Sequence, residues 1–445
     1  MGSSSGETDG LFQSRQGKLL SLSTKAYVIV ASALLCLSNL MLPVENGLPP
    51  FHIGPAPITL PVIAAGLAAV VLALQPRTRF LRTLHMPYCV LWSALLVYFL
   101  AASCLQGEFL VSLLSVGMMS MAFLINYMVI VCLFRLGGRD LFAKVLCVVA
   151  ACATVPGIYE FVTGSRLPVY AEINTLYWLS RNMSSGLRGS TYDWRVTGTL
   201  GNPIVYSAAM MLCMPFACEL KSKLSRRVLC GLLLFAAFST LSRAAFLFAG
   251  SLLVGYVAIE KKKSVRVLLA VILLAGVVLS GSDVVYDNTL TSRWQSRFHE
   301  ETEAGDQGGV PARLSLIQTT VDACTADGPL GFLLGKGFLS SRQIGLAFSD
   351  VLETIDNAYV TILYENGLVG LIGYVALYGW LLYRSRSLAF HSYHWYSVLG
   401  FMLAGMSFVT YGFGTISFVA VASMAIITTS RPCAKPSAAD EPHAE

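Results

Sequence analysis

Long apolar runs recur along this chain from end to end, and such runs cross the roughly 30 Å hydrocarbon core of a bilayer as helices. Of its 445 residues, 55% are hydrophobic and only 13% are charged, and the mean hydropathy is +0.65. A membrane β-barrel would instead show short strands in which apolar and polar residues alternate. The sequence therefore predicts an all-α, polytopic membrane protein.

The apolar runs divide into about twelve predicted transmembrane helices. The connections after the even-numbered runs are short and rich in lysine and arginine, which indicates that these connections and both termini are cytoplasmic. The N-terminal tail lacks the pattern of a cleaved signal, so the first run is expected to stay as an anchor. The predicted runs are 26–44, 57–75, 87–105, 109–134, 141–162, 203–219, 228–241, 244–259, 267–283, 357–383, 393–411 and 414–430.

Only two connections are long, and both fall on the predicted outer side of the membrane. They are expected to hold any water-exposed site. The predicted order is a cytoplasmic tail (1–25), N-terminal membrane helices (26–162), a first long outer loop (163–202), central membrane helices (203–283), a second long outer loop (284–356), C-terminal membrane helices (357–430) and a cytoplasmic tail (431–445).

A lone pair of polar residues, Ser242-Arg243, separates two uncharged apolar runs on the predicted outer side. An arginine at that depth costs on the order of several kcal/mol and is disfavoured outside the cytoplasm. We therefore expect Arg243 to be held there for an anionic ligand.

The first outer loop combines arginines with tyrosines and tryptophans. Arginine can hold two phosphate oxygens at once, and aromatic faces stack on sugar rings. The alternative is that the aromatic residues form an interfacial belt and the arginines are solvated, which is less expected for Arg195, just before a run. Glu160 lies near the end of the run that precedes this loop. It is expected either to contact substrate or to have a structural role, in which it pairs with an arginine or caps a neighbouring turn. The other arginines of this loop are Arg166, Arg181 and Arg188.

The second outer loop contains a predicted amphipathic helix, 313–326, that begins at Arg313. A cation at a helix N-terminus opposes the helix dipole, so Arg313 is expected to contact a ligand. A tight turn follows at 334–338, and Asp356-Asn357 leads into the next run. An aspartate at that junction either accepts a proton from substrate or caps the helix.

Other residues have simpler expected roles. Gly367, Gly370 and Gly373 recur at the spacing that lets helices pack closely. Glu365 is expected to pair or cap near the end of a run rather than to act in catalysis. His299 in the second outer loop could act as a base, but it lies beside an acidic stretch and is rather expected to be a solvated surface residue.

Several short motifs follow one another between about residues 155 and 380: Thr240–Ala245, Arg313 with the 334–338 turn, Asp356–Tyr359 and Glu365–Gly370, with weaker matches at Gly157–Gly164 and Arg195–Pro203. In this order they resemble signatures of the O-antigen ligase and polymerase superfamily. The resemblance implies an inner-membrane glycosyltransferase of GT-C-like architecture that acts at the periplasmic face on sugars linked to undecaprenyl diphosphate, without a metal or other cofactor. Ligases of this family typically have His-Asn where this chain has Asp356-Asn357, and the Asp-Asn form is similar to Wzy-type polymerases of capsule or exopolysaccharide. Polymerase is therefore favoured over ligase.

The resemblance also implies roles for individual residues. Arg243 and Arg313 would stabilise the departing lipid diphosphate as catalytic residues, and Asp356 would accept the proton of the attacking hydroxyl. The expected substrate-binding residues are Arg195, Asn357, Arg188 and Glu160. The expected partners are a lipid-linked donor and acceptor, the membrane, a chain-length regulator and a flippase, and no nucleic acid.

Two function classes compete with a glycosyltransferase. A flippase or transporter typically shows two similar halves and ionisable groups near the middle of the membrane, and neither feature is visible in this sequence. An assembly protein without activity would tolerate replacement of each arginine. The absence of a nucleotide-binding glycine loop, of Cys/His metal spacing and of an Asp-x-Asp pair argues against an ATP-driven pump, a zinc protease and a cytoplasmic nucleotide-sugar enzyme.

Overall fold

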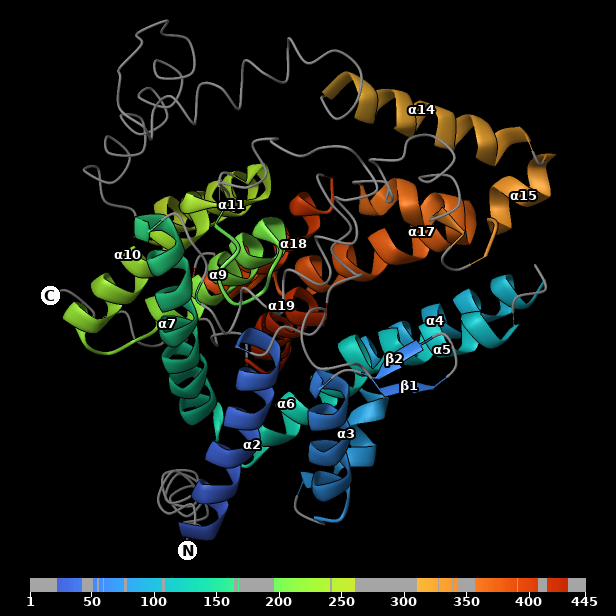
Figure 1. Ribbon diagram of the computed structural model, residues 1–445. Helices are drawn as coiled ribbons and strands as arrows, with labels where there is room; N and C mark the ends of the chain where they lie inside the picture. Colours follow the sequence, from blue (N-terminus) through green and yellow to red (C-terminus); the bar gives the residue numbers. More distant parts are fainter. Residues whose placement is uncertain are drawn as a thin grey trace, which may run out of the picture.

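The computed structural model describes residues 22–41, 51–53, 56–58, 60–75, 78–105, 109–163, 167, 196–240, 242–260, 310–326, 328–337, 340–341, 357–389, 391–406 and 414–430. These residues form a bundle of helices (Figure 1). The helices are α2 (Leu22–Leu40), α3 (Leu60–Ala73), η2 (Phe80–His85), α4 (Pro87–Leu105), α5 (Phe109–Met119), η3 (Ser120–Ile125), α6 (Asn126–Arg135), α7 (Arg139–Thr163), α9 (Pro203–Cys218), α10 (Lys223–Ser239), α11 (Arg243–Glu260), α14 (Val310–Ala326), α15 (Gly328–Leu334), α17 (Ala358–Arg384), η5 (Arg386–Leu388), α18 (Tyr393–Ala404) and α19 (Gly414–Thr429).

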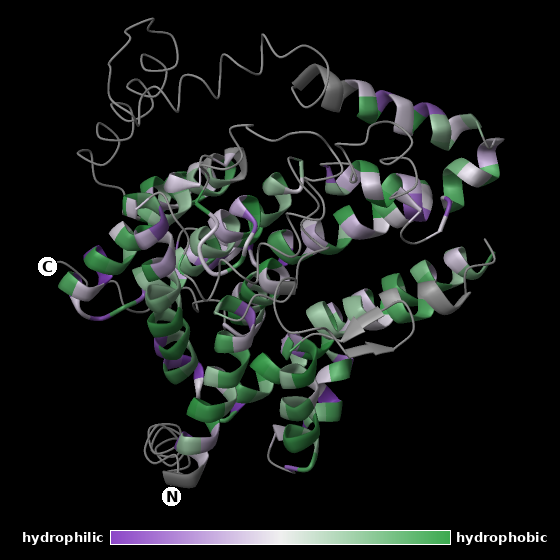
Figure 2. Ribbon diagram, in the orientation of Figure 1, coloured by the Kyte–Doolittle hydropathy of each residue, from purple (hydrophilic) through white to green (hydrophobic). Residues whose placement is uncertain are grey.

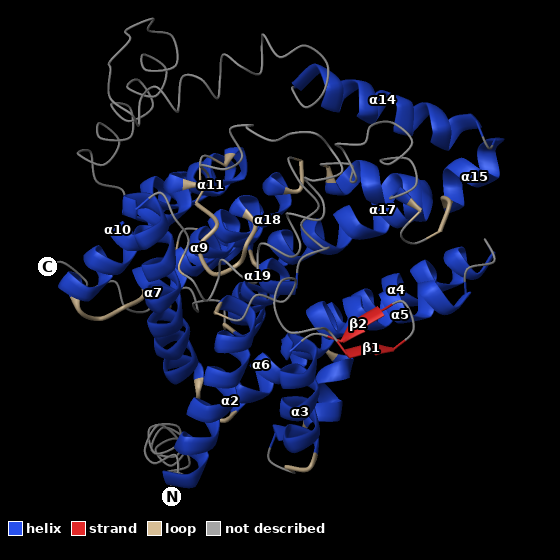
Figure 3. Ribbon diagram, in the orientation of Figure 1, coloured by secondary structure: helices blue, strands red, loops and turns tan. Residues whose placement is uncertain are grey.

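The predicted helical class is confirmed, with one short exception. A β-hairpin joins β1 (Phe51–Ile53) to β2 (Ala56–Ile58), antiparallel, with Phe51 opposite Ile58 (Figure 3). Because the hairpin lies just before α3, that helix begins slightly later than the predicted run.

A helix stands in each predicted apolar run except 267–283, which lies outside the described residues. Among the described residues, four helices are long and apolar enough to cross a membrane: Pro87–Leu105, Val116–Arg135, Arg139–Thr163 and Ala358–Arg384. Apolar residues line most of their length (Figure 2), as expected of a multi-pass membrane protein. The number of spans and the GT-C-like architecture stay predictions.

Helix α19 lies at the centre of the bundle. Every residue from Thr415 to Ile427 is buried, and the helix packs against α2, α6, α9 and α18. A helix that is apolar on all sides is stable only where protein or lipid surrounds it. This position explains why the last run shows no polar face.

Aromatic side chains join α4 and α17 to the rest of the bundle. The ring of Trp92 on α4 lies 4.8 Å from that of Phe123 on η3 and 6.5 Å from that of Tyr374 on α17. The ring of Phe123 in turn lies 6.5 Å from that of Phe401 on α18. Such ring pairs add to the free energy of burial through their tilted and edge-on geometry. This cluster holds α17, which carries several of the predicted motifs.

Helix α17 is broken at Gly367, whose φ of 65° and ψ of −175° are not helical. A break inside an apolar bundle frees backbone groups that need hydrogen-bond partners. The predicted tight turn supplies them, because the Lys336 amide donates to the Tyr364 carbonyl (2.8 Å) and the Gly337 amide donates to the Glu365 carbonyl (2.9 Å). The turn that follows α15 is thus inserted at the break of α17.

The three regularly spaced glycines of α17 therefore have two different roles. A Cβ at Gly370 or Gly373 would meet side chains of α4, so these two glycines serve helix packing as predicted. Gly367 differs, because its φ is positive and a Cβ there would collide with the backbone of Leu333. A Cβ at Gly335 would likewise collide with the backbone of Gly367, so each glycine makes room for the other chain segment.

Replacing either glycine at this crossing should unfold the contact between α15 and α17. Gly367→Ala and Gly335→Ala should each lower the free energy of unfolding by about 2 kcal/mol or more, because alanine is strained at positive φ and its Cβ meets backbone. Gly379→Ala is the matched control, since a Cβ there meets nothing within 4 Å. Thermal unfolding of the purified protein in detergent measures all three, and equal midpoints would contradict the close approach.

Candidate functional site

Glu160, near the end of α7, clamps the turn that precedes α9. Its Oε2 accepts hydrogen bonds from the amides of Thr197 (2.8 Å) and Gly198 (2.9 Å), and its Oε1 accepts one from Thr197 Oγ1 (3.1 Å). Both Thr197 and the following Thr199 are buried, and Thr199 Oγ1 donates to the Leu40 carbonyl at 2.6 Å. The expectation that Glu160 caps a neighbouring turn is therefore confirmed. Its contact with substrate stays a prediction.

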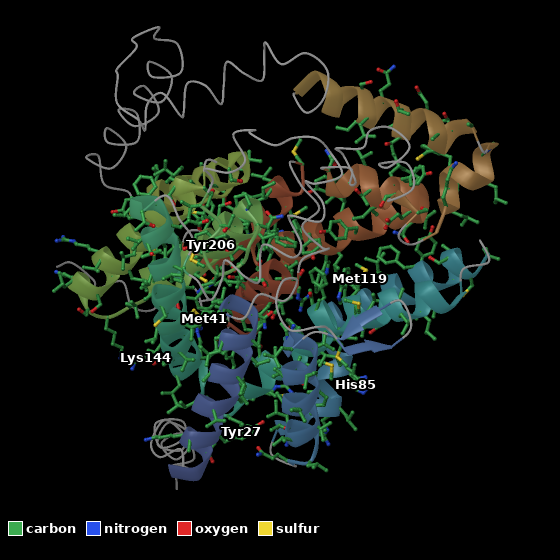
Figure 4. All side chains as sticks on the ribbon, in the orientation of Figure 1. Tyr27, Met41, His85, Met119, Lys144 and Tyr206 are labelled. Carbon is green, nitrogen blue, oxygen red and sulfur yellow. The ribbon has the colours of Figure 1, made fainter. Side chains whose placement is uncertain are left out.

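Tyr206 on α9 explains two glycines of the weaker motifs. Its hydroxyl donates to the Ala153 carbonyl at 3.0 Å, so the ring fills the space between α9 and α7 (labelled in Figure 4). A Cβ at Gly157 or at Gly198 would collide with this ring, and Gly198 has a φ of 54°. Sequence reasoning missed Tyr206, although the two glycines that face it were part of the matched motifs.

The turn held by Glu160 and Tyr206 leads directly into α9. The side chain of Asn202 caps this helix by accepting hydrogen bonds from the amides of Ile204 (2.9 Å) and Val205 (3.3 Å). Residues from Val196 to Leu200 are buried. Arg195, which directly precedes this turn in the sequence, and Arg188 both lie outside the described residues.

The Ser242-Arg243 pair lies at a junction between two helices, as predicted. Helix α10 ends at Ser239 and α11 begins at Arg243. Thr240 is fully buried and orders the junction, because its hydroxyl donates to the Ala237 carbonyl (2.7 Å) and accepts from the Ser242 amide (3.2 Å). Arg243 is therefore the first residue of α11, whose first turn contains no acidic residue.

The predicted amphipathic helix of the second loop is confirmed as α14, which begins at Val310 and includes Arg313 in its first turn. Its buried stripe is Leu316, Thr320 and Cys324, one residue per helical turn. The helix packs on α17 and α15, and Figure 1 shows it along the edge of the molecule above α17. The first turn of α14 also lacks an acidic residue. The side chains of Arg243 and Arg313 themselves lie outside the described residues.

Asn357 caps α17. Its Oδ1 accepts hydrogen bonds from the amides of Tyr359 (3.0 Å) and Val360 (3.1 Å), and its Nδ2 donates to the Met406 carbonyl at 3.1 Å. The alternative that Asp356 caps this helix is therefore wrong, because Asn357 fills that position. Asp356 stands one residue before the cap, outside the described residues, and substrate contact by Asn357 stays a prediction.

Glu365 is buried next to the break in α17, with 2% of its surface exposed. Its Oε1 accepts a hydrogen bond from Ser341 Oγ at 2.5 Å. The neighbouring Asn366 carbonyl accepts from the Tyr98 hydroxyl of α4 at 2.8 Å. The carboxylate of Glu365 thus ties the chain beyond the tight turn to α17, in agreement with its expected structural role.

The structure brings Glu160 together with the turn before α9, and the tight turn together with Glu365. No group of three or more His, Cys, Asp or Glu side chains is close enough to hold a metal ion within the part of the chain that the structure describes.

The comparisons with known proteins give one family. A model of the O-antigen ligase family matches residues 228–375, which include most of α10, all of α11, α14 and α15, and the first part of α17. The resemblance to the O-antigen ligase and polymerase superfamily is thereby confirmed for this segment. No curated protein matches the chain.

Two substitutions of Glu160 distinguish its role as a hydrogen-bond acceptor from the effect of its negative charge. Glu160→Ala should lower the free energy of unfolding by about 2 kcal/mol, because the buried amides of Thr197 and Gly198 lose their acceptor. Glu160→Gln keeps an acceptor oxygen and should lose much less. Thermal unfolding checks both, with Val162→Ala, an exposed position on the same helix, as control. If the glutamine variant is as unstable as the alanine variant, the negative charge itself is required and simple capping is refuted.

Proposed function

We propose that this chain, whose residues 228–375 carry the O-antigen ligase domain, is a polysaccharide polymerase that joins repeat units linked to undecaprenyl diphosphate. The reaction takes place at the periplasmic face of the inner membrane and needs no metal. The observation that carries the proposal is the position of two arginines, because Arg243 and Arg313 both stand in the first turn of a helix.

The starts of α11 and α14, each of which carries an arginine, are favourable places for an anion to bind. The first turn of a helix exposes N–H groups and the positive end of the helix dipole, which attract negative charge. Natural helices often place a carboxylate there, yet the first turns of α11 and α14 contain none and bear an arginine instead. The positive charge is unbalanced within each turn, and a diphosphate would balance it.

The proposed reaction is a single displacement. The acceptor hydroxyl attacks the anomeric carbon of the donor, the bond from that carbon to the diphosphate oxygen breaks, and the lipid diphosphate leaves with the electron pair. Negative charge grows on the leaving oxygen, so Arg243 and Arg313, with Arg195 nearby, stabilise the transition state more than the ground state. The configuration of the anomeric carbon would be inverted.

Asp356 is proposed to accept the proton of the attacking hydroxyl. It precedes Asn357, whose side chain is held by the start of α17 and by the Met406 carbonyl. The next residue is fixed as well, since the Ala358 amide donates to the Gly405 carbonyl at 2.7 Å. Because Asn357 and Ala358 are both held in place, the chain directly after Asp356 is fixed. This supports the proposal that Asp356 acts as a base from a defined position. Asn357 and Glu160 would then act mainly as positioning residues, while Arg188 would bind the glycan.

A ligase that transfers the glycan to a lipid or protein acceptor is the alternative within the same family, and a flippase is the alternative outside it. The Asp356-Asn357 sequence favours the polymerase. A polymerase would work with a flippase that delivers repeat units and with a regulator of chain length.

Purified protein and lipid-linked repeat units in EDTA test this proposal. Arg243→Lys, Arg313→Lys and Asp356→Asn should each form polymer about 100-fold more slowly or worse, because the first two lose the planar fork and the third loses the base. Arg227→Gln is the control, because this exposed arginine lies near the start of α10, whereas Arg243 follows the end of that helix.

The products distinguish the candidate functions. A ladder of longer lipid-linked chains from repeat units alone supports the polymerase. Transfer only after a lipid A-core acceptor is added would identify a ligase. Normal polymer from stable Arg243→Lys and Asp356→Asn proteins would refute the proposed roles of these residues.

A further inference from the structure

A cavity of about 460 Å³ lies at the end of the bundle opposite the candidate site. It is formed where α17 and α19 end and α4 begins, together with Tyr127 of α6. The candidate site lies at the other ends of these elements, for example at Asn357, the cap of α17. The two sites are thus separated by the length of α17, and nothing in the proposed reaction uses this cavity.

The wall of the cavity combines one cation, several hydroxyl groups and an apolar surface. Arg384 provides the cation, and Ser387, Thr428 and Ser430 provide hydroxyl groups. Leu381 and Ile427 belong to the apolar part, with Trp380 beside Arg384 at 5.8 Å from ring centroid to Cζ. This mixture fits an amphiphile with a negatively charged head, because neither a fully polar ion nor a hydrocarbon would contact the whole wall.

The local charge is positive. No carboxylate lies within ion-pair distance of Arg384 or Arg135 in the part of the chain that the structure describes. Arg135 borders the same wall, because its Nη2 lies 3.6 Å from the Sδ of Met86, a lining residue. Arg139 reaches the hydroxyl of Ser430 at 3.4 Å but also pairs with Glu219. The C-termini of α17 and α19 reduce this positive potential without cancelling two full charges.

The wall also contains a buried hydroxyl group without a partner. Tyr88 lines the cavity and is 1% exposed, and its Oη has no hydrogen-bond partner among the described residues. Its ring is fixed against that of Tyr127 at 4.2 Å. The Tyr127 hydroxyl, in contrast, is paired with Thr428 Oγ1 at 2.7 Å. Because the Tyr88 hydroxyl is itself buried, Tyr88 contributes its ring to the apolar part of the wall and is not counted as a polar contact for an occupant.

We propose that this cavity binds the phosphate-bearing headgroup of an anionic phospholipid, with Arg384 as the principal phosphate contact. The hydroxyl groups of Ser387 and Ser430 suit the glycerol part of the headgroup, and the apolar wall suits the first segment of the acyl chains. Basic cavities between membrane helices on the cytoplasmic side are suited to such lipids, and the lysine- and arginine-rich connections assign this end to the cytoplasm.

Native mass spectrometry of the purified full chain, with phosphatidylglycerol or phosphatidylcholine added, tests this proposal. The wild type should retain phosphatidylglycerol in preference, and Arg384→Gln should weaken its binding by about 10-fold. Arg384→Lys should keep most of the affinity, since the charge stays. Arg386→Gln is the matched control, because this neighbouring arginine stacks on the ring of Tyr383 at 4.2 Å and does not line the cavity.

Each remaining outcome overturns the proposal. Equal losses in Arg384→Gln and Arg386→Gln would mean that the lipid responds only to surface charge. Equal retention of the two lipids by the wild type would mean that no anionic headgroup is recognised. Complete displacement of phosphatidylglycerol by millimolar inorganic phosphate would identify a site for free phosphate. Lipid binding is measured without any reaction taking place, so its result does not depend on the proposed polymerase activity. Polymer formation by Arg384→Gln can be assayed separately.

Discussion

Backbone hydrogen bonding in an apolar environment is the constraint on which the rest of this structure depends. Helices satisfy it internally, and so the described chain is almost entirely helical. The break of α17 at Gly367 is tolerated because the turn containing Lys336 and Gly337 donates to the carbonyls of Tyr364 and Glu365. The tight turn and the Glu365–Gly370 motif, which are distant in the sequence, are therefore in direct contact, and disrupting either one would remove the hydrogen bonds between them.

The same need for partners shapes the candidate site. Glu160 supplies acceptors for a turn that has no regular secondary structure, and Asn357 supplies them for the start of α17. Glu160 holds Thr197 and Gly198, which follow Arg195 closely in the sequence. Asn357 directly follows Asp356 and caps α17. Buried polar groups thus fix the chain on which the proposed substrate contacts depend. Arg243 and Arg313 differ, because each is placed by the start of a helix.

Much of this arrangement could be predicted from the sequence, for identifiable reasons. Continuous apolar runs predicted the membrane helices, and near-helical spacing of apolar residues after Arg313 predicted the helix that the structure shows as α14. The buried stripe of α14, which includes the polar Thr320, was not predicted. The break of α17 was missed, since Gly367 at a three-residue spacing also fits ordinary helix packing. The role of Tyr206 was missed as well, because a tyrosine inside an apolar run gives no sign that two distant glycines face its ring. Contacts between distant segments are not encoded in local periodicity.

The central claim is that Arg243 and Arg313 bind one lipid diphosphate from two helix starts. Its most direct test is the equilibrium affinity of purified protein for a non-reactive polyprenyl diphosphate and for the corresponding alcohol, measured in EDTA. We expect the diphosphate to bind about 100-fold more tightly, and Arg243→Gln and Arg313→Gln each to reduce this preference by about 10-fold or more. Equal binding of diphosphate and alcohol, or an unchanged preference in both variants, would contradict the claim.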